Sequence, residues 1–122
     1  MTILPDLIER NFGVLTGKPI SNINLLPKNL LLETEGVTYF LNAEGAENFP
    51  ACYDRARRVL KQIMLNHQSD ENILLVAHGD IGKMLYAAAN DIPWREALTH
   101  FHFKNTQVIP LSKKCLDLFM PK

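Results

Sequence analysis

The sequence predicts one α/β domain with a mostly parallel sheet, extending over residues 1–122. Three consecutive segments carry this prediction: an amphipathic helix that begins near Glu47, an unbroken apolar run over residues 73–77, and a run of helix formers over residues 81–89. A helix, a buried strand and a second helix in alternation are typical of α/β proteins with parallel strands. A chain of 122 residues is long enough for one such domain and has no room for a second.

The N-terminal third of the chain predicts little regular structure. Glycines and prolines punctuate residues 7–19, which is typical of a loop-rich segment. Residues 21–32 are ambiguous, because a helix that Ser21 caps would be broken by Pro27. The β-branched and aromatic residues of 37–41 favour a short strand before the first helix.

The helix near Glu47 has the clearest periodicity in the chain. Pro50 stands where a first helical turn tolerates proline, and polar residues 66–69 should end the helix. Between them, apolar side chains recur every three or four positions, with charged side chains filling the gaps: Phe49, Cys52, Tyr53, Ala56, Val59, Leu60, Ile63 and Met64. We therefore expect one face to pack in the core, and we expect the basic residues, Arg55 among them, on the solvated face.

The apolar run of residues 73–77 predicts a strand that is buried on both faces. His78, Gly79 and Asp80 then form a turn before the helix of residues 81–89. The histidine thus follows the carboxyl end of a strand and precedes a helix N-terminus. In open α/β sheets ligands bind at this position, and the helix amides favour anions, so a phosphate is a reasonable ligand.

The C-terminal third predicts a turn, a short helix and a hairpin. Residues 90–93 form the turn, and Pro93 starts a helix over residues 94–98. Residues 106–111 and 115–119 then predict two strands of a hairpin.

Composition excludes several classes of protein. A hydrophobic content of 47% with 21% charged residues argues against global disorder. Thirteen basic and thirteen acidic side chains cancel, so nothing indicates a nucleic-acid or membrane-surface partner. Cys52 and Cys115 lack metal-ligand spacing, which favours two buried thiols in a reducing compartment. Pro5 and Asp6 interrupt any apolar leader, and no run reaches the length of a membrane span, so we expect a cytoplasmic protein.

Two residues could carry chemistry. Glu9, with Arg10 beside it, fits a general acid next to a phosphate-binding arginine, although a surface ion pair on a loop is the simpler interpretation. His78 fits a nucleophile, a phosphate ligand or a base, and the alternative is a buried structural histidine.

The other polar candidates have simpler explanations. Asp80 fits a helix cap, and Glu47 fits a carboxylate at a helix N-terminus. His100 and His102 alternate with phenylalanines, as on one face of an extended segment, and no third metal ligand is apparent. His67 fits a charge at the end of a helix.

Four blocks of the sequence together resemble one protein family. Residues 7–18, Leu-Ile-Glu-Arg-Asn-Phe-Gly-Val-Leu-Thr-Gly-Lys, resemble the segment around the acid glutamate in the histidine phosphatase superfamily, the phosphoglycerate mutase-like enzymes. Residues 45–48, with Arg55 in the following helix, look like that family's Gly-Glu-Ser segment. Residues 74–81 are similar to its second histidine motif, and residues 103–106 resemble its asparagine-containing approach to a late strand.

The resemblance implies a three-layer α/β/α sandwich with a mostly parallel sheet and a phosphohistidine mechanism that uses no metal or cofactor. By motif match, Glu9 would protonate the leaving oxygen and His78 would be the second, phosphate-binding histidine. Backbone amides around Gly79 and the following helix N-terminus would complete an anion cradle, with Arg10 as a further phosphate ligand. The implied partner is a phosphorylated small molecule or a phosphoprotein.

The sequence also departs from the family pattern. It contains neither the Arg-His-Gly motif that supplies the nucleophile nor a Ser-Pro-Leu-x-Arg-Ala segment, and residues 45–48 insert an alanine and lose the serine. A first βαβ unit, on the order of 30 residues, is therefore expected to be missing. We expect a partial domain, either truncated, degenerate or one half of a complemented site, with little or no activity alone.

This departure has a structural consequence and leaves one rival function. The strand over residues 73–77 would lose a neighbour and expose an apolar edge, which a second copy or a complementing chain would cover. The rival to a partial enzyme is a non-catalytic phosphate-binding or protein-interaction module on the same scaffold.

Overall fold

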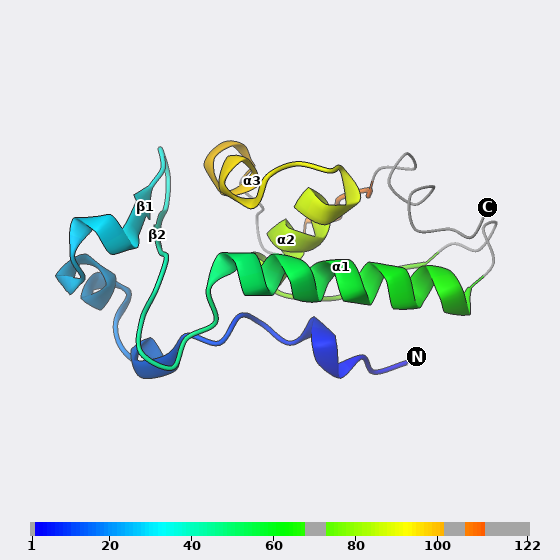
Figure 1. The fold of residues 1–122 in the computed structure, drawn as a ribbon, viewed down its shortest axis with the longest axis horizontal. Helices are drawn as coiled ribbons and strands as arrows, with labels where there is room; N and C mark the ends of the chain where they lie inside the picture. Colours follow the sequence, from blue (N-terminus) through cyan, green and yellow to red (C-terminus); the bar gives the residue numbers. More distant parts are fainter. Residues whose placement is uncertain (1, 68–72, 102–106, 112–122) are drawn as a thin grey trace.

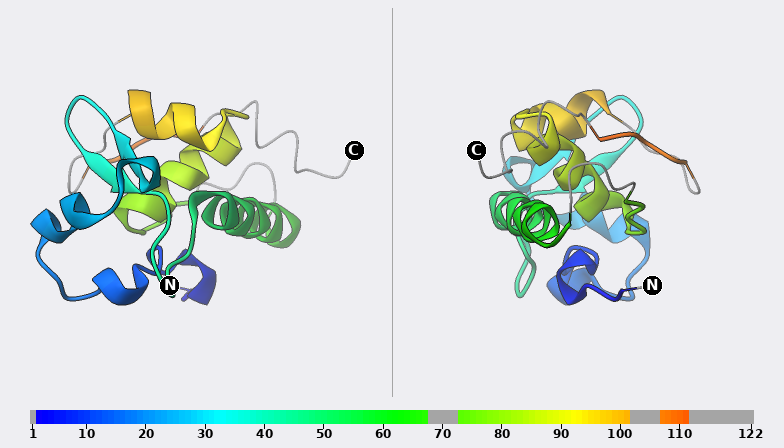
Figure 2. Two further views of the ribbon diagram at one scale, coloured as in Figure 1. Left: turned by 60° about the vertical axis from the view of Figure 1, so that its left-hand side comes forward. Right: turned by 90° about the vertical axis from the view of Figure 1, so that its right-hand side faces the viewer.

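A computed structural model describes residues 2–67, 73–101 and 107–111 of the chain. Within these ranges the elements are two strands and three α-helices: β1 (Leu31–Glu33), β2 (Thr38–Phe40), α1 (Phe49–Asn66), α2 (Gly79–Ala89) and α3 (Trp94–His100). α2 and α3 lie along one side of α1, and the N-terminal segment runs along its other side (Figure 1). Two further views show the same arrangement, with the small sheet beyond the N-terminal end of α1 (Figure 2).

Helix α1 confirms the predicted amphipathic helix. The side chain of Asn48 caps it, because its Oδ1 accepts a hydrogen bond of 2.9 Å from the amide of Ala51. Pro50 lies in the first turn, as predicted, and the helix ends at Asn66. Its buried face carries the predicted apolar stripe: Phe49, Cys52, Ala56, Val59, Leu60 and Ile63.

The hydrophobic core lies between α1 and the pair α2–α3. Ile81 and Met84 of α2 and Leu98 of α3 are fully buried against the stripe of α1. Phe49 stacks on Trp94, the first residue of α3, with ring centroids 5.7 Å apart. Full burial of one such side chain contributes about 1.5–3 kcal/mol, and most of the buried apolar side chains belong to these helices.

Helices α2 and α3 confirm the two C-terminal helix predictions with small shifts in their bounds. α2 begins at Gly79, two residues before the predicted start, and α3 follows Pro93 directly. The chain turns between them as predicted, with Asp91 at a φ of 53°. α3 extends to His100, so the expected extended segment with His100 on one face is wrong at that residue. His102 lies outside the described residues.

The N-terminal third is loop-rich, as predicted, and contains 3-10 turns rather than α-helices: Pro5–Leu7, Gly13–Leu15, Ile20–Leu25 and Lys28–Leu30. The ambiguous residues 21–32 thus divide between 3-10 turns and β1. β2 confirms the strand predicted within residues 37–41. It pairs antiparallel with β1, with Leu31 opposite Phe40 and Glu33 opposite Thr38.

The buried strand predicted over residues 73–77 is wrong. In the described part of the chain this segment belongs to no sheet, and Leu74 and Val76 are 76% and 81% exposed. Leu75 is the member that packs against the core. A buried strand needs backbone partners on both sides, and the described sheet consists of β1 and β2. The three-layer sandwich with a mostly parallel sheet therefore stays a prediction.

The predicted C-terminal hairpin is described only in part. Residues 107–111 are not in a strand, with Val108 exposed and Leu111 packed against the core. Residue 106 and residues 115–119 lie outside the described ranges, as do the block 103–106 and Cys115. No helix in the described ranges is both long and apolar enough to cross a membrane.

Candidate active site

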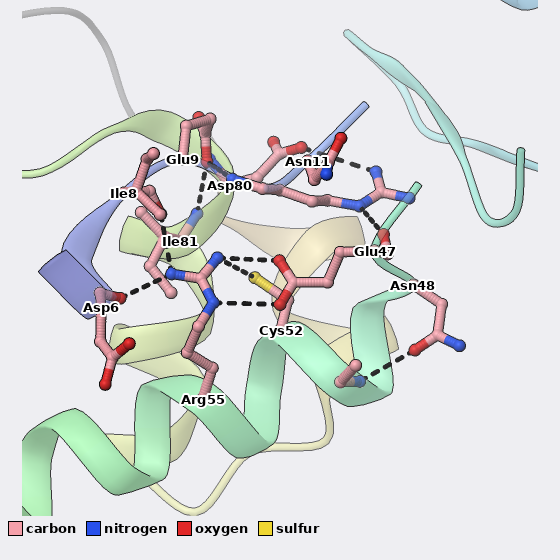
Figure 3. Close-up of polar contacts among 12 residues, drawn as sticks. Asp6, Ile8, Glu9, Asn11, Glu47, Asn48, Cys52, Arg55, Asp80 and Ile81 are labelled. Carbon is pink, nitrogen blue, oxygen red and sulfur yellow. Dashed lines mark hydrogen bonds and ion pairs between the residues drawn. The ribbon is translucent and has the colours of Figure 1, made fainter. Parts of the chain in front are cut away.

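Glu9 and His78, the two residues predicted to carry chemistry, meet at the N-terminus of α2. His78 is the N-cap residue of the helix, and the carboxylate of Glu9 accepts hydrogen bonds from its first turn. The amide of Asp80 donates to Oε2 over 3.1 Å, and the amide of Ile81 donates to Oε1 over 2.9 Å (Figure 3). Glu9 thus supplies the capping acceptor of α2 from about 70 positions away in the sequence.

The predicted role of Asp80 as a helix cap is therefore wrong, because Glu9 occupies the amides that a cap would bond. The carboxylate of Asp80 lies instead beside Arg10, with its Oδ2 3.6 Å from Nη1 of the guanidinium. Burial, followed by the nearby charge of Glu9, raises the pKa of Asp80.

His78 is exposed, so the alternative of a buried structural histidine is wrong. Gly79 is exposed next to it. The backbone amides expected to bind an anion are partly occupied, however, because two amides of the first turn of α2 already donate to Glu9. An anion at this helix end would lie beside the carboxylate of Glu9. The phosphate-binding roles of His78 and Gly79 stay predictions.

Arg10 is buried, so a surface ion pair between Arg10 and Glu9 is wrong. Its side chain has 0% exposure. Nε donates to the carbonyl of Glu47 and Nη2 to the carbonyl of Phe40, both over 2.7 Å. The guanidinium lies between the rings of Phe40 and Phe49, 3.9 and 3.8 Å from their centroids. Burial lowers the pKa of Arg10, and the charge of Asp80 opposes that shift.

One nitrogen of the Arg10 guanidinium, Nη1, is buried without a hydrogen bond among the described residues. Among the described residues, Nη1 has no hydrogen-bond partner, since 3.6 Å to Asp80 is an ion pair too long for a hydrogen bond. Nη1 therefore faces the N-terminal turn of α2 with an N–H group to donate. The phosphate-binding role of Arg10 stays a prediction that rests on this atom.

Arg55 was expected on a solvated helix face, and that expectation is wrong. Its side chain is 10% exposed and forms a bidentate ion pair with Glu47, with Nη2 2.8 Å from Oε1 and Nε 3.0 Å from Oε2 (Figure 3). Glu47 is therefore an ion-pair partner of Arg55, in addition to being a carboxylate near a helix N-terminus. The sequence held a signal, because position 55 falls on the apolar stripe, three residues after Cys52 and four before Val59.

The loop of residues 44–47 docks beside Glu9 through backbone contacts. Phe12 and Ala46 form an isolated antiparallel bridge, and the amide of Glu47 donates to the carbonyl of Asn11 over 2.9 Å. The side chain of Asn11 accepts a hydrogen bond from the amide of Gly13, which tightens the turn. A shallow pocket lies at this junction, and Glu9, Asn11, Glu47 and Arg55 are among its lining residues.

The ion pair makes stability depend on pH. The hydrogen bond from Arg55 lowers the pKa of Glu47 below its usual 4.5 in the folded state. The stabilisation is therefore complete above that value and is lost as the pH falls through the folded-state pKa. We expect the free energy of unfolding of wild type to decrease below pH 4.5 more steeply than that of Glu47→Gln, measured by urea unfolding at several pH values. Parallel curves for the two proteins would contradict this expectation.

The remaining candidates within the described ranges form no second site. Cys52 is buried, and burial raises the pKa of its thiol to about 12, so it is not a reactive nucleophile. His67 follows the last residue of α1, and His100 ends α3. Among the described residues, no three side chains of His, Cys, Asp or Glu gather as metal ligands would.

The comparisons with known proteins agree with the blocks around Glu9 and His78. The family model of the histidine phosphatase superfamily (branch 1) matches residues 1–114. No curated protein and no solved structure matches the chain. The family match covers most of the chain and includes both residues at the N-terminus of α2.

Proposed function

Because this chain belongs to the histidine phosphatase superfamily, we propose that it is a partial phosphatase domain whose Glu9 and His78 form one half of a phosphoryl-transfer site. The family reaction is phosphomonoester hydrolysis or phosphoryl transfer through a phosphohistidine. The observation that carries the proposal is the contact of the Glu9 carboxylate with the helix turn that follows His78. It joins the two blocks that the resemblance assigns to catalysis.

Glu9 is the proposed general acid, and its hydrogen bonds favour one atom for the proton. Oε1 accepts from the amides of Arg10 and Ile81, whereas Oε2 accepts from the amide of Asp80. A carboxylate oxygen has two lone pairs, so Oε2 keeps one for a proton that the leaving oxygen receives. His78 and Gly79, with Nη1 of Arg10, are the proposed phosphate ligands beside it.

The proposed site needs a nucleophile from elsewhere. None of the four histidines stands in an Arg-His-Gly motif, so we propose that these 122 residues alone turn over little or no phosphomonoester. The exposed run around Leu74 and Val76 is where a further strand would pair to build the mostly parallel sheet of the sandwich. That strand would come from a further segment, a complementing chain or a second copy.

The test combines phosphate binding with turnover. We expect the purified 122-residue protein to bind vanadate in titration calorimetry and to leave p-nitrophenyl phosphate intact. His78→Ala should weaken vanadate binding at least tenfold, because a hydrogen bond to a charged group contributes about 1.5–3 kcal/mol. His100→Ala, an exposed histidine on α3, is the matched control and should bind as wild type does.

Addition of a peptide or chain that carries an Arg-His-Gly strand separates the two candidate functions. Turnover that appears on mixing and is lost in Glu9→Gln supports the partial enzyme. Vanadate binding without turnover in any mixture supports the alternative, a non-catalytic module for phosphorylated small molecules or phosphoproteins. The exposed position of His78 favours this alternative over a purely structural domain, which would bind no vanadate. Rapid turnover by the unmixed protein, lost in His78→Ala, would contradict the proposal.

A further inference from the structure

We propose that Arg55, oriented by Glu47, is a positioning residue that sets the place of the Glu9 carboxylate at the N-terminus of α2. The importance of this role for catalysis rests on the proposed function of Glu9. The effect of Arg55 on the position of Glu9 is independent of that function, because it concerns contacts within the chain. Arg55 lies on α1 and does not touch the carboxylate of Glu9 in the described structure, so it acts through the backbone.

The guanidinium of Arg55 has two sides with different partners. One side forms the bidentate pair with Glu47, and on the other side Nη1 donates to two backbone carbonyls, of Asp6 over 2.6 Å and of Ile8 over 2.8 Å. The remaining N–H group of Nη2 points to Sγ of Cys52 over 3.8 Å. All five donors of the guanidinium are thus used, which fixes its plane.

The carbonyl of Ile8 belongs to the peptide group that leads into Glu9. A hydrogen bond to this carbonyl therefore sets the orientation of the peptide plane from which the Glu9 side chain departs. Among the described residues, the backbone hydrogen bonds of this segment are local, from the amide of Leu7 to the carbonyl of Leu4 and from the amide of Ile8 to the carbonyl of Pro5. Arg55 thus bonds the backbone of this segment to α1, whereas the Glu9 side chain bonds α2.

Glu47 connects the bond between Arg55 and Ile8 to a second contact, on the other side of Glu9. Its carboxylate holds Arg55, and its backbone carbonyl accepts from Nε of Arg10. Glu9 therefore lies between Ile8, whose carbonyl is connected to Glu47 through Arg55, and Arg10, whose side chain bonds the carbonyl of Glu47. The arrangement needs arginine at position 55, because a lysine ammonium cannot bond the carboxylate in a fork and reach two carbonyls at once.

A purely structural role would give a different result in one measurement. If Arg55 only attaches the N-terminal segment to α1, its loss lowers stability but leaves Glu9 on α2. If Arg55 positions Glu9, its loss releases the hydrogen bond to the amide of Ile81 while α1 and its own cap remain. The amide of Ala51, which bonds Asn48 at the start of α1, reports on that cap.

The experiment records the amide chemical shifts of the 122-residue protein by nuclear magnetic resonance. The hydrogen bond from the Ile81 amide to the Glu9 carboxylate should change the Ile81 shift, so the difference in this shift between wild type and Glu9→Ala, called here the Ile81 change, measures the bond. Arg55→Met should lose at least half of the Ile81 change, with the Ala51 shift unchanged.

Two further variants complete the design. Arg55→Lys keeps the positive charge but cannot form the bidentate pair, and it should lose less of the Ile81 change than Arg55→Met. Arg58→Met, exposed on the same helix, should leave it at the wild-type amplitude. If Arg55→Met does not fold, Arg55→Lys and Glu47→Gln decide, and both should show a reduced change. A full wild-type change at Ile81 in folded Arg55→Met, or in both of these variants, overturns the proposal. No step depends on phosphate binding or turnover, so this result and the proposed function fail separately.

Discussion

Alanine at position 13 is expected to destabilise the protein by about 2–5 kcal/mol. Gly13 has a φ of +56°, a conformation that costs a residue with a side chain about 1–2 kcal/mol. A Cβ atom there would also overlap the carbonyl oxygen of Glu44 and lie 2.5 Å from the amide nitrogen of Ala46. Relief of such an overlap costs about a further 1–3 kcal/mol, because both neighbours are backbone atoms that cannot rotate away.

Gly17→Ala is the matched control for this effect. Gly17 has a similar φ of +76°, but nothing lies within 4 Å of the place of its Cβ. Its substitution should cost the backbone part alone, about 1–2 kcal/mol. Urea unfolding of both variants measures the difference. Equal losses of stability would show that the close approach between residue 13 and the loop of residues 44–46 is absent in solution.

Replacement of Arg10 with methionine is expected to destabilise the protein by about 3–5 kcal/mol, the usual loss when one partner of a buried ion pair is removed. Methionine fills the space between the rings of Phe40 and Phe49 but donates no hydrogen bond. The carbonyls of Phe40 and Glu47 would lose their donors. Arg10→Lys should give an intermediate loss, since lysine restores the charge but not the fork.

A double-mutant cycle separates the charge from the carbonyl bonds. The Asp80 carboxylate lies 3.6 Å from Nη1 of Arg10, so Arg10→Met leaves it beside no cation. Asp80→Asn should therefore cost less stability in the Arg10→Met background than in wild type. Lys61→Met, exposed on α1, should stay within about 0.5 kcal/mol of wild type. A loss below about 1 kcal/mol in Arg10→Met would contradict the buried position of the guanidinium.

The helices were predictable because their causes are local. The apolar stripe of α1, its cap at Asn48 and the first-turn Pro50 all lie within a few residues of the bonds they affect. The same is true of Pro93, which precedes α3. The helical hydrogen bond joins residues four positions apart, so composition over one or two turns is sufficient to indicate it.

The candidate site was predictable where a motif carried it. The blocks around Glu9 and His78 gave two of its residues, and the family match covers both. The roles of Arg10 and Arg55 in the interior were not predictable in the same way. Their carbonyl partners belong to Asp6, Ile8, Phe40 and Glu47, and no local pattern tells which carbonyls a guanidinium will meet.

The sequence by itself determined the family and the bounds of the helices to within a few residues. It also indicated that the segment around Glu9 and the segment around His78 belong to one candidate site. Only the tertiary structure decided that residues 73–77 stay outside the described sheet, that Glu9 caps α2, and that two arginines anchor the chain on either side of Glu9. The physical reason is the distance along the chain between partners. A strand needs neighbours, and a buried charge needs acceptors, and both come from segments that meet only when the chain folds.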